Sequence, residues 1–133
     1  MKRVVLLLLL FLPLMGVMSA QTANQQAGVL SPTQIQALFP AAVYFSGQMA
    51  TVQLRNAGGV RWSEGKQTLF AMVDAGGYST GMRERYQFYI LSDVPIDIAA
   101  KRLPAGAYGG GFLTDKGLEV MDLGGTELFH SAV

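Results

Sequence analysis

Cysteine is absent from this chain of 133 residues, and histidine occurs only once, at position 130. The lack of thiols excludes cysteine nucleophiles, disulfide bridges and cysteine-ligated metal sites. His130 lies close to the C-terminus and is predicted to be exposed, so neither a histidine-based triad nor a multi-histidine metal site is expected. The glycine-rich segments lack the strand-to-helix context of a phosphate-binding loop. We therefore predict no enzyme, no catalytic residues, no metal site and no cofactor.

After residue 20 the sequence has no apolar run long enough to cross a membrane. Before that point, a basic start leads into the apolar run Val4–Leu14, and the small residues Ser19 and Ala20 follow. A basic start, an apolar run shorter than the ~20 residues of a membrane span and then small residues are typical of a cleavable signal peptide. We predict a signal peptide over residues 1–20 and export to the periplasm or beyond, so the cleaved protein is not an integral membrane protein. The alternatives are cleavage after Ser19 and an uncleaved anchor helix.

Charged residues make up only 14% of the chain, and the two signs nearly balance. Cleavage would remove Lys2 and Arg3, which lowers Lys plus Arg from 10 to 8 against 9 Asp plus Glu. Such a chain lacks the basic surface that nucleic acid binding requires, so no nucleic acid partner is expected. The remaining length fits one domain. We predict a flexible polar leader over residues 21–30 and a single β domain over residues 31–133.

A short helix is predicted at the start of this domain. Ser31 can cap the helix, Pro32 suits its first position, and Gln34 completes a capping box. Pro40 is expected to end the helix after one or two turns. A helix this short requires packing against the rest of the domain.

The rest of the domain consists of short apolar or alternating runs separated by turn residues, which indicates β-strands. The predicted strands are Val43–Phe45, Ala50–Asn56, Val60–Trp62, Gln67–Asp74, Tyr86–Leu91, Val94–Ile98, Ala107–Leu113 and Leu118–Leu123, with a further short one at Glu127–Phe129 left open. Residues 96–123 form a predicted meander with turns at 100–102 and 115–117. Gln67–Asp74 and Tyr86–Leu91 are apolar on both faces, which favours covered central strands. We predict an all-β, antiparallel barrel or sandwich of seven or eight short strands.

Three consecutive glycines, Gly109–Gly111, interrupt one of these predicted strands. Tyr108 and Phe112 would lie on one face with Gly110 between them. Glycine in a strand permits a bend or a close approach of another chain segment, as at a barrel corner. The alternative is a frayed loop.

Two carboxylates, Asp74 and Asp122, end apolar strands and are expected to be the partly buried acids. A glycosidase-like pair would place two carboxyl groups across a cleft. Separate hydrogen bonds at the two strand ends are the favoured interpretation.

The best candidate for a binding surface is a group of aromatic and arginine residues near the glycine-rich loop 75–81. Such residues are enriched at binding surfaces. Arg83 and Arg85 are predicted to lie in an extended segment and therefore to point to one side. The alternative is that the tyrosines belong to the core and the arginines to a solvated surface. The predicted site residues are Tyr78, Arg83, Arg85, Tyr86, Arg55 and Trp62.

The segment Lys101–Tyr108, with the sequence KRLPAGAY, resembles a hairpin phrase, Leu-Pro-Ala-Gly-x-Tyr, of exported bacterial β-sandwich proteins. The segments VQLRNAGGVRW, VDAGGYST, ERYQFYILSDVPI and AYGGGF are similar to small exported β-proteins of unknown function from soil bacteria of the acidobacterial group. The similarity spans residues 43–125. It implies an exported β-protein and carries neither an activity nor site residues.

These observations predict an exported, non-catalytic binding or envelope-associated module whose ligand is unknown. The first alternative is a carrier that holds a small apolar ligand in a β-barrel cavity. A hydrolase of unknown type is the third possibility. A filled interior would favour the module, a large lined cavity the carrier, and a buried carboxylate pair the hydrolase. The expected partner is accordingly a cell-envelope component or a small apolar ligand.

Overall fold

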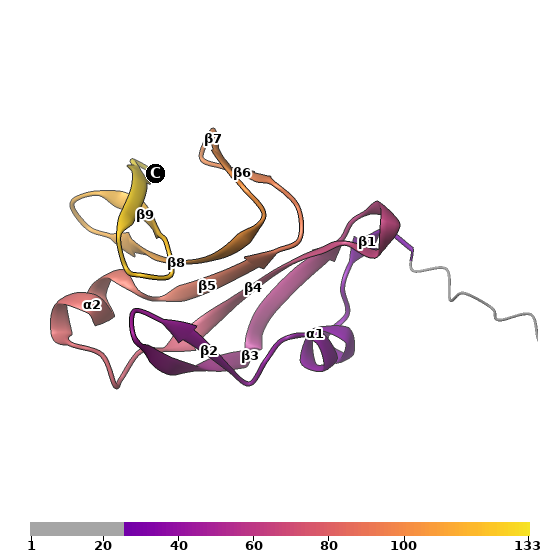
Figure 1. Ribbon diagram of the computed structural model, residues 1–133, viewed down its shortest axis with the longest axis horizontal. Coiled ribbons are helices and arrows are strands. Elements are labelled where there is room, and N and C mark those ends of the chain that lie inside the picture. The colour runs from indigo at the N-terminus through magenta and orange to yellow at the C-terminus, as the bar shows by residue number, and fades with distance from the viewer. Residues whose placement is uncertain (1–25) are drawn as a thin grey trace, which may run out of the picture.

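A computed structural model of the chain describes residues 26–133 (Figure 1). The predicted signal peptide, its cleavage site and the first half of the predicted leader lie outside the described residues. No helix within residues 26–133 has the length and apolar character needed to span a membrane. In chain order the elements are β1 (Gly28–Val29), α1 (Pro32–Leu38), β2 (Ala42–Phe45), β3 (Gln48–Arg61), a 3₁₀ turn (Ser63–Gly65), β4 (Gln67–Asp74), α2 (Thr80–Arg85), β5 (Phe88–Ser92), β6 (Ile96–Ile98), β7 (Lys101–Leu103), β8 (Gly106–Leu113), β9 (Gly117–Met121) and β10 (Glu127–Ser131).

The predicted all-β, antiparallel class is confirmed. One large sheet has the order β1-β3-β4-β5-β8-β9-β10, β2 pairs with β3, and β6 and β7 form a separate hairpin. Every pairing is antiparallel. The sheet does not close into a barrel, so the architecture is sandwich-like. The described residues form ten strands, more than the seven or eight predicted. Two predicted strands merge into β3, while β1 and β7 were not expected and β10 is the strand left open.

The N-terminal helix α1 has the predicted capping box. The Gln34 amide donates to Ser31 Oγ at 3.3 Å, and the Ser31 amide donates to Gln34 Oε1 at 2.8 Å. The helix buries Ile35 against β3 at Gly59. A Cβ atom at Gly59 would lie 2.9 Å from Ile35 Cδ1 and 2.8 Å from Leu69 Cδ2, so only glycine lets the helix approach this closely.

The main sheet has an apolar residue set on each face, and Figure 1 shows what lies against each. In one row of paired residues Ala71, Tyr89, Gly109 and Met121 point to the face covered by α1 and β2, which we call the covered face. In the next row Met72, Phe88, Gly110 and Val120 point to the opposite side, which we call the open face. The hairpin β6–β7 packs over part of the open face through Ile96, Ile98 and Leu103.

The glycine run in β8 lies within the sheet, and its second glycine lies between Tyr108 and Phe112 on the open face, as predicted. A Cβ atom at Gly109 would overlap the Phe45 ring on the covered face, 2.8 Å from its Cζ. A Cβ atom at Gly110 would lie 2.6 Å from Phe88 Cζ on the open face. The run therefore lets aromatic rings press on the backbone from both sides, and the frayed-loop alternative is wrong.

Two turns were placed wrongly from the sequence. The hairpin turn expected at residues 100–102 lies at Ala99 and Ala100, whose φ angles are 49° and 62°. Two-residue hairpin turns need positive φ at both positions, and Asn-Gly usually signals them, so an Ala-Ala pair hides the turn. The predicted strands Ala50–Asn56 and Val60–Trp62 are not separated by a turn but merge into the single long strand β3 (Gln48–Arg61), which has a bulge where its register with β4 shifts between Val52 and Ala57.

Candidate functional site

Tyr78 and Tyr86, two of the predicted site residues, belong to the core. Their side chains are 6% and 1% exposed. The Tyr86 ring stacks on Phe45 with a centroid separation of 4.0 Å, and Tyr78 meets Tyr86 edge-on at 5.2 Å. The Tyr78 hydroxyl donates to the carbonyl oxygens of Phe45 at 2.8 Å and Gln48 at 3.1 Å. Burial raises the pKa of both tyrosines. These rings fasten the β2–β3 hairpin to the sheet, so they are not available to a ligand.

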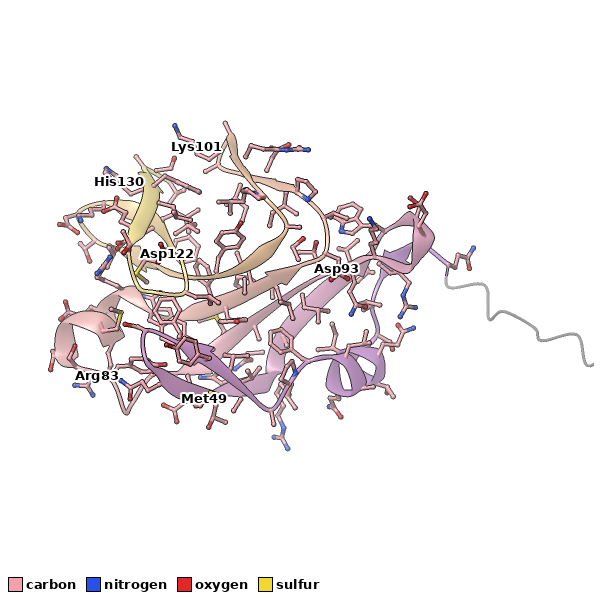
Figure 2. All side chains as sticks on the ribbon, in the orientation of Figure 1. Met49, Arg83, Asp93, Lys101, Asp122 and His130 are labelled. Carbon is pink, nitrogen blue, oxygen red and sulfur yellow. The ribbon has the colours of Figure 1, made fainter. Side chains whose placement is uncertain are left out.

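Arg83 and Arg85 lie on a helix, and the predicted extended segment is wrong. Ser79 caps α2 by accepting a hydrogen bond from the Met82 amide at 3.3 Å. Residues two apart on a helix do not share a face, so the two arginines diverge. Arg83 points into solvent at the edge of the molecule, where its guanidinium donates to Thr80 Oγ1 at 3.3 Å (Figure 2).

Arg85 forms an ion pair with Glu119, a residue that the sequence analysis did not single out. Arg85 Nε lies 3.0 Å from Oε1 and 3.2 Å from Oε2 of Glu119, which is fully buried in β9. The hydrogen bond to this carboxylate raises the pKa of Arg85. Gly111 leaves room for the chain around the arginine, since a Cβ there would lie 2.7 Å from the Arg85 carbonyl oxygen. The guanidinium thus compensates a buried charge and has a structural role.

The last two predicted residues, Arg55 and Trp62, lie on β3 and directly after it. Arg55 is exposed within the bulge of β3. Trp62 is 41% exposed, and its Nε1 donates to Thr68 Oγ1 at 2.9 Å. Because two of the six residues are buried and a third is held in an ion pair, the predicted patch does not form. Trp62 instead borders a different surface, on the open face of the sheet.

That surface is a row of aromatic rings on the open face. Phe70, Phe88 and Phe112 come from the neighbouring strands β4, β5 and β8, with centroid separations of 5.1 Å and 6.1 Å along the row. The central ring of Phe88 is 2% exposed, whereas Phe70 is 39% and Phe112 is 58% exposed. Trp62 contacts Thr68, which is two residues from Phe70 and so on the same face. We call these four residues, Trp62, Phe70, Phe88 and Phe112, the aromatic stripe.

The polar groups beside the stripe are paired with one another. Besides accepting from Trp62, Thr68 Oγ1 shares a hydrogen bond of 2.7 Å with Ser92 Oγ. The Ser92 hydroxyl in turn lies 2.7 Å from the Val94 carbonyl oxygen. With these groups engaged, the stripe offers ring faces to a partner, and stacking is the contact it supports best.

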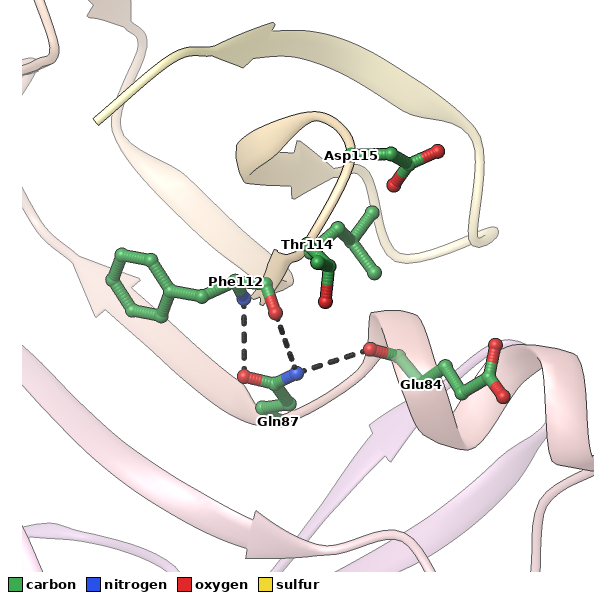
Figure 3. Close-up of a pocket in the computed structure, with 6 residues that line it drawn as sticks. Glu84, Gln87, Phe112, Thr114 and Asp115 are labelled. Atoms are coloured by element: carbon green, nitrogen blue, oxygen red, sulfur yellow. Dashed lines mark hydrogen bonds between the residues drawn. The ribbon is translucent and has the colours of Figure 1, made fainter.

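An open surface pocket of about 510 Å³ adjoins the stripe at its Phe112 end (Figure 3). Gln87 forms part of the wall of this pocket, and the Gln87 carboxamide makes hydrogen bonds with the backbone of β8 and α2. Its Oε1 accepts from the Phe112 amide at 3.0 Å, and its Nε2 donates to the Phe112 carbonyl oxygen at 3.1 Å and to that of Glu84 at 3.0 Å. Glu84 and Asp115 line the same pocket. Figure 3 shows the Phe112 ring pointing away from these two side chains, so the pocket does not extend the ring surface of the stripe.

Asp74 and Asp122, the two acids considered for a hydrolase, form separate hydrogen bonds, as predicted. Asp74 Oδ1 accepts from the Gly76 amide at 3.1 Å, and Asp122 Oδ1 accepts from the amides of Gly124 and Thr126 at 3.0 Å. Asp122 is half-buried, as predicted, whereas the prediction is wrong for Asp74, which is exposed. The fully buried acid is Glu119. Within residues 26–133 no group of three or more His, Cys, Asp or Glu side chains is arranged to hold a metal ion.

No protein-family model, curated protein or solved structure matches the chain.

Proposed function

We propose that the protein is a non-catalytic binding module that is exported and holds a component of the cell envelope on its aromatic stripe. The observation that carries this proposal is the exposure of Phe70 and Phe112 on either side of the buried Phe88. Exposure of a cluster of large aromatic side chains to water is energetically unfavourable, and exposed apolar clusters of this kind mark interaction surfaces. Aromatic rings also supply rigid contact area at a low cost in side-chain entropy.

The filled interior supports a surface-binding module over a carrier. The space between the sheet and β2 contains Phe45, Tyr78, Tyr86 and Tyr89, each 6% exposed or less. The sheet is not closed, so it does not form the barrel cavity that a carrier of this fold would need. The sequence of residues 1–20 is the basis for placing the module outside the cytoplasm.

The proposal can be tested by cosedimentation of the purified protein with envelope from its own host. Phe112→Ala removes the most exposed ring of the stripe and should strongly reduce the sedimented fraction. Tyr44→Ala is the matched control, because Tyr44 is 51% exposed on β2, away from the open face, and this variant should sediment like the parent.

A blocking variant avoids removing any ring. Gly58 pairs with Phe70 on the open face, and a Cβ there would meet no atom within 4 Å. Gly58→Glu should therefore fold normally while placing a charged side chain beside the stripe, and it should also lose binding. Equal sedimentation of the parent, Phe112→Ala and Gly58→Glu would refute the proposal.

A further inference from the structure

We infer that the envelope component held on the aromatic stripe is an extended polysaccharide chain of low charge. The inference rests on the proposed function and adds the chemical class of the partner. Four features of the stripe lead to it: the area, the shape, the contact chemistry and the charge.

The exposed area of the stripe is small. Trp62, Phe70 and Phe112 are 41%, 39% and 58% exposed. With ~150–250 Å² for a whole aromatic side chain, they offer together about 300 Å². A stable interface between two folded proteins needs roughly 800 Å² on each partner. A second copy of this chain or another globular protein would therefore be held too weakly by the stripe, whereas a narrow polymer strand matches its width.

The shape of the accessible surface depends on the hairpin β6–β7. Figure 1 shows that this hairpin lies on the same side of the sheet as strand β9, above β5 and β8. Hairpin residues Ile98 and Leu103 pack in the same cluster as Phe88, which is 2% exposed. A partner therefore reaches the exposed rings that flank Phe88, and not the whole open face.

The contact chemistry matches sugar rings. The separations of 5.1 Å and 6.1 Å add up to at most about 11 Å between the exposed rings of Phe70 and Phe112. Every second sugar of an extended polysaccharide presents an apolar C–H face at a comparable interval, and such faces stack on aromatic rings. Their hydroxyl groups stay in water at the ring edges. This suits a stripe whose own polar groups, at Trp62 and Thr68, are already paired.

The charges near the stripe are mixed in sign. Lys66 and Asp74, one of each sign, lie at the two ends of the β4 segment that carries Phe70. Near the Phe112 end, Glu84 and Asp115 line the pocket, and the exposed Lys116 follows Asp115 in the chain. Because neither sign dominates, the surface does not attract a charged polymer, and a neutral polysaccharide needs no such attraction.

The test compares binding to four portions of the same envelope preparation: untreated, protease-digested, lipid-extracted, and digested with a muramidase plus a glucanase mixture. The reagents are removed before the protein is added. We expect the parent to bind the first three portions equally and to lose binding to the fourth. On each portion that binds, Phe112→Ala should weaken binding about tenfold or more, equivalent to about 1.4 kcal/mol, and Tyr44→Ala should not.

The other outcomes separate the two proposals. Loss of binding after lipid extraction would identify a lipid surface as the partner, and loss after protease digestion would identify a protein. Either result, if it depends on Phe112, overturns the polysaccharide inference and leaves the binding module intact. Failure of the parent to bind untreated envelope overturns both.

Discussion

Tyr78→Phe and Tyr86→Phe remove the same hydroxyl group from two rings that touch each other, and the structure predicts opposite effects on stability. The Tyr78 hydroxyl donates to two carbonyl oxygens at the β2–β3 turn, those of Phe45 and Gln48. The Tyr86 hydroxyl is buried and has no hydrogen-bond partner among the described residues. The aromatic packing of both rings is unchanged by either substitution, so each variant isolates one hydroxyl.

The magnitudes follow from these contacts. A buried intramolecular hydrogen bond contributes about 0.5–1.5 kcal/mol net, so Tyr78→Phe should lower the free energy of unfolding by about 1 kcal/mol or slightly more. A buried polar group without a partner costs about 1–3 kcal/mol in lost hydration. Tyr86→Phe removes this cost and should leave the free energy of unfolding unchanged or raise it by about 1 kcal/mol.

Urea denaturation followed by far-UV circular dichroism measures both variants on the same scale. Equal slopes of free energy against urea concentration would show that the substitutions change stability and not the extent of unfolding. The reasoning is refuted if Tyr86→Phe destabilises the protein as much as Tyr78→Phe, because the Tyr86 hydroxyl would then have a partner in the folded state.

Three further predictions concern stability. Gly59→Ala should lower the free energy of unfolding by roughly 1–3 kcal/mol, because its Cβ would press on α1 and β4. Gly58→Ala is the control and should change the free energy of unfolding little. Equal urea midpoints for the two variants would contradict this prediction. Glu119→Gln should cost about 2 kcal/mol, less than a fully buried pair because its arginine partner is 32% exposed, while Asp97→Asn in an exposed pair should cost under about 0.5 kcal/mol in the same assay. Burial raises the folded-state pKa of Tyr86 above its ordinary value of 10.0. The unfolded chain therefore releases the Tyr86 proton at lower pH than the folded protein does, and the free energy of unfolding should fall as pH rises past 10.0. In urea denaturation at increasing pH, Tyr86→Phe should show a smaller fall.

The features predicted correctly from the sequence depend on short-range rules. The capping box spans four residues, 31–34, and Gln67–Asp74 forms β4 with the bounds predicted, because local pattern suffices for each. The close packing at the glycine run could also be predicted, because three glycines in a strand leave space that another segment must fill.

The errors arise where distant segments decide the outcome. The six residues of α2 contain a glycine and form a helix through the Ser79 cap and packing against β8. Glu119 occupies an ordinary polar position in the sequence, and its burial depends on Arg85, which lies 34 residues earlier. The predicted cover over both faces of β4 is incomplete, because Phe70 is 39% exposed. The pattern of apolar residues along the sequence does not indicate which face of the sheet remains exposed, so the aromatic stripe could not be predicted from the sequence.

The fit of the Phe45 ring against Gly109 also sets an order of events during biosynthesis. Phe45 belongs to the second strand and Gly109 to the eighth, and the amide of Ser46 donates to the Leu123 carbonyl oxygen at 2.8 Å beyond β9. A chain that emerges with its N-terminus first exposes the β2–β3 hairpin long before its partners are made. The first hairpin must then wait for the last third of the chain, and during that interval its apolar side and free strand edge are open to aggregation.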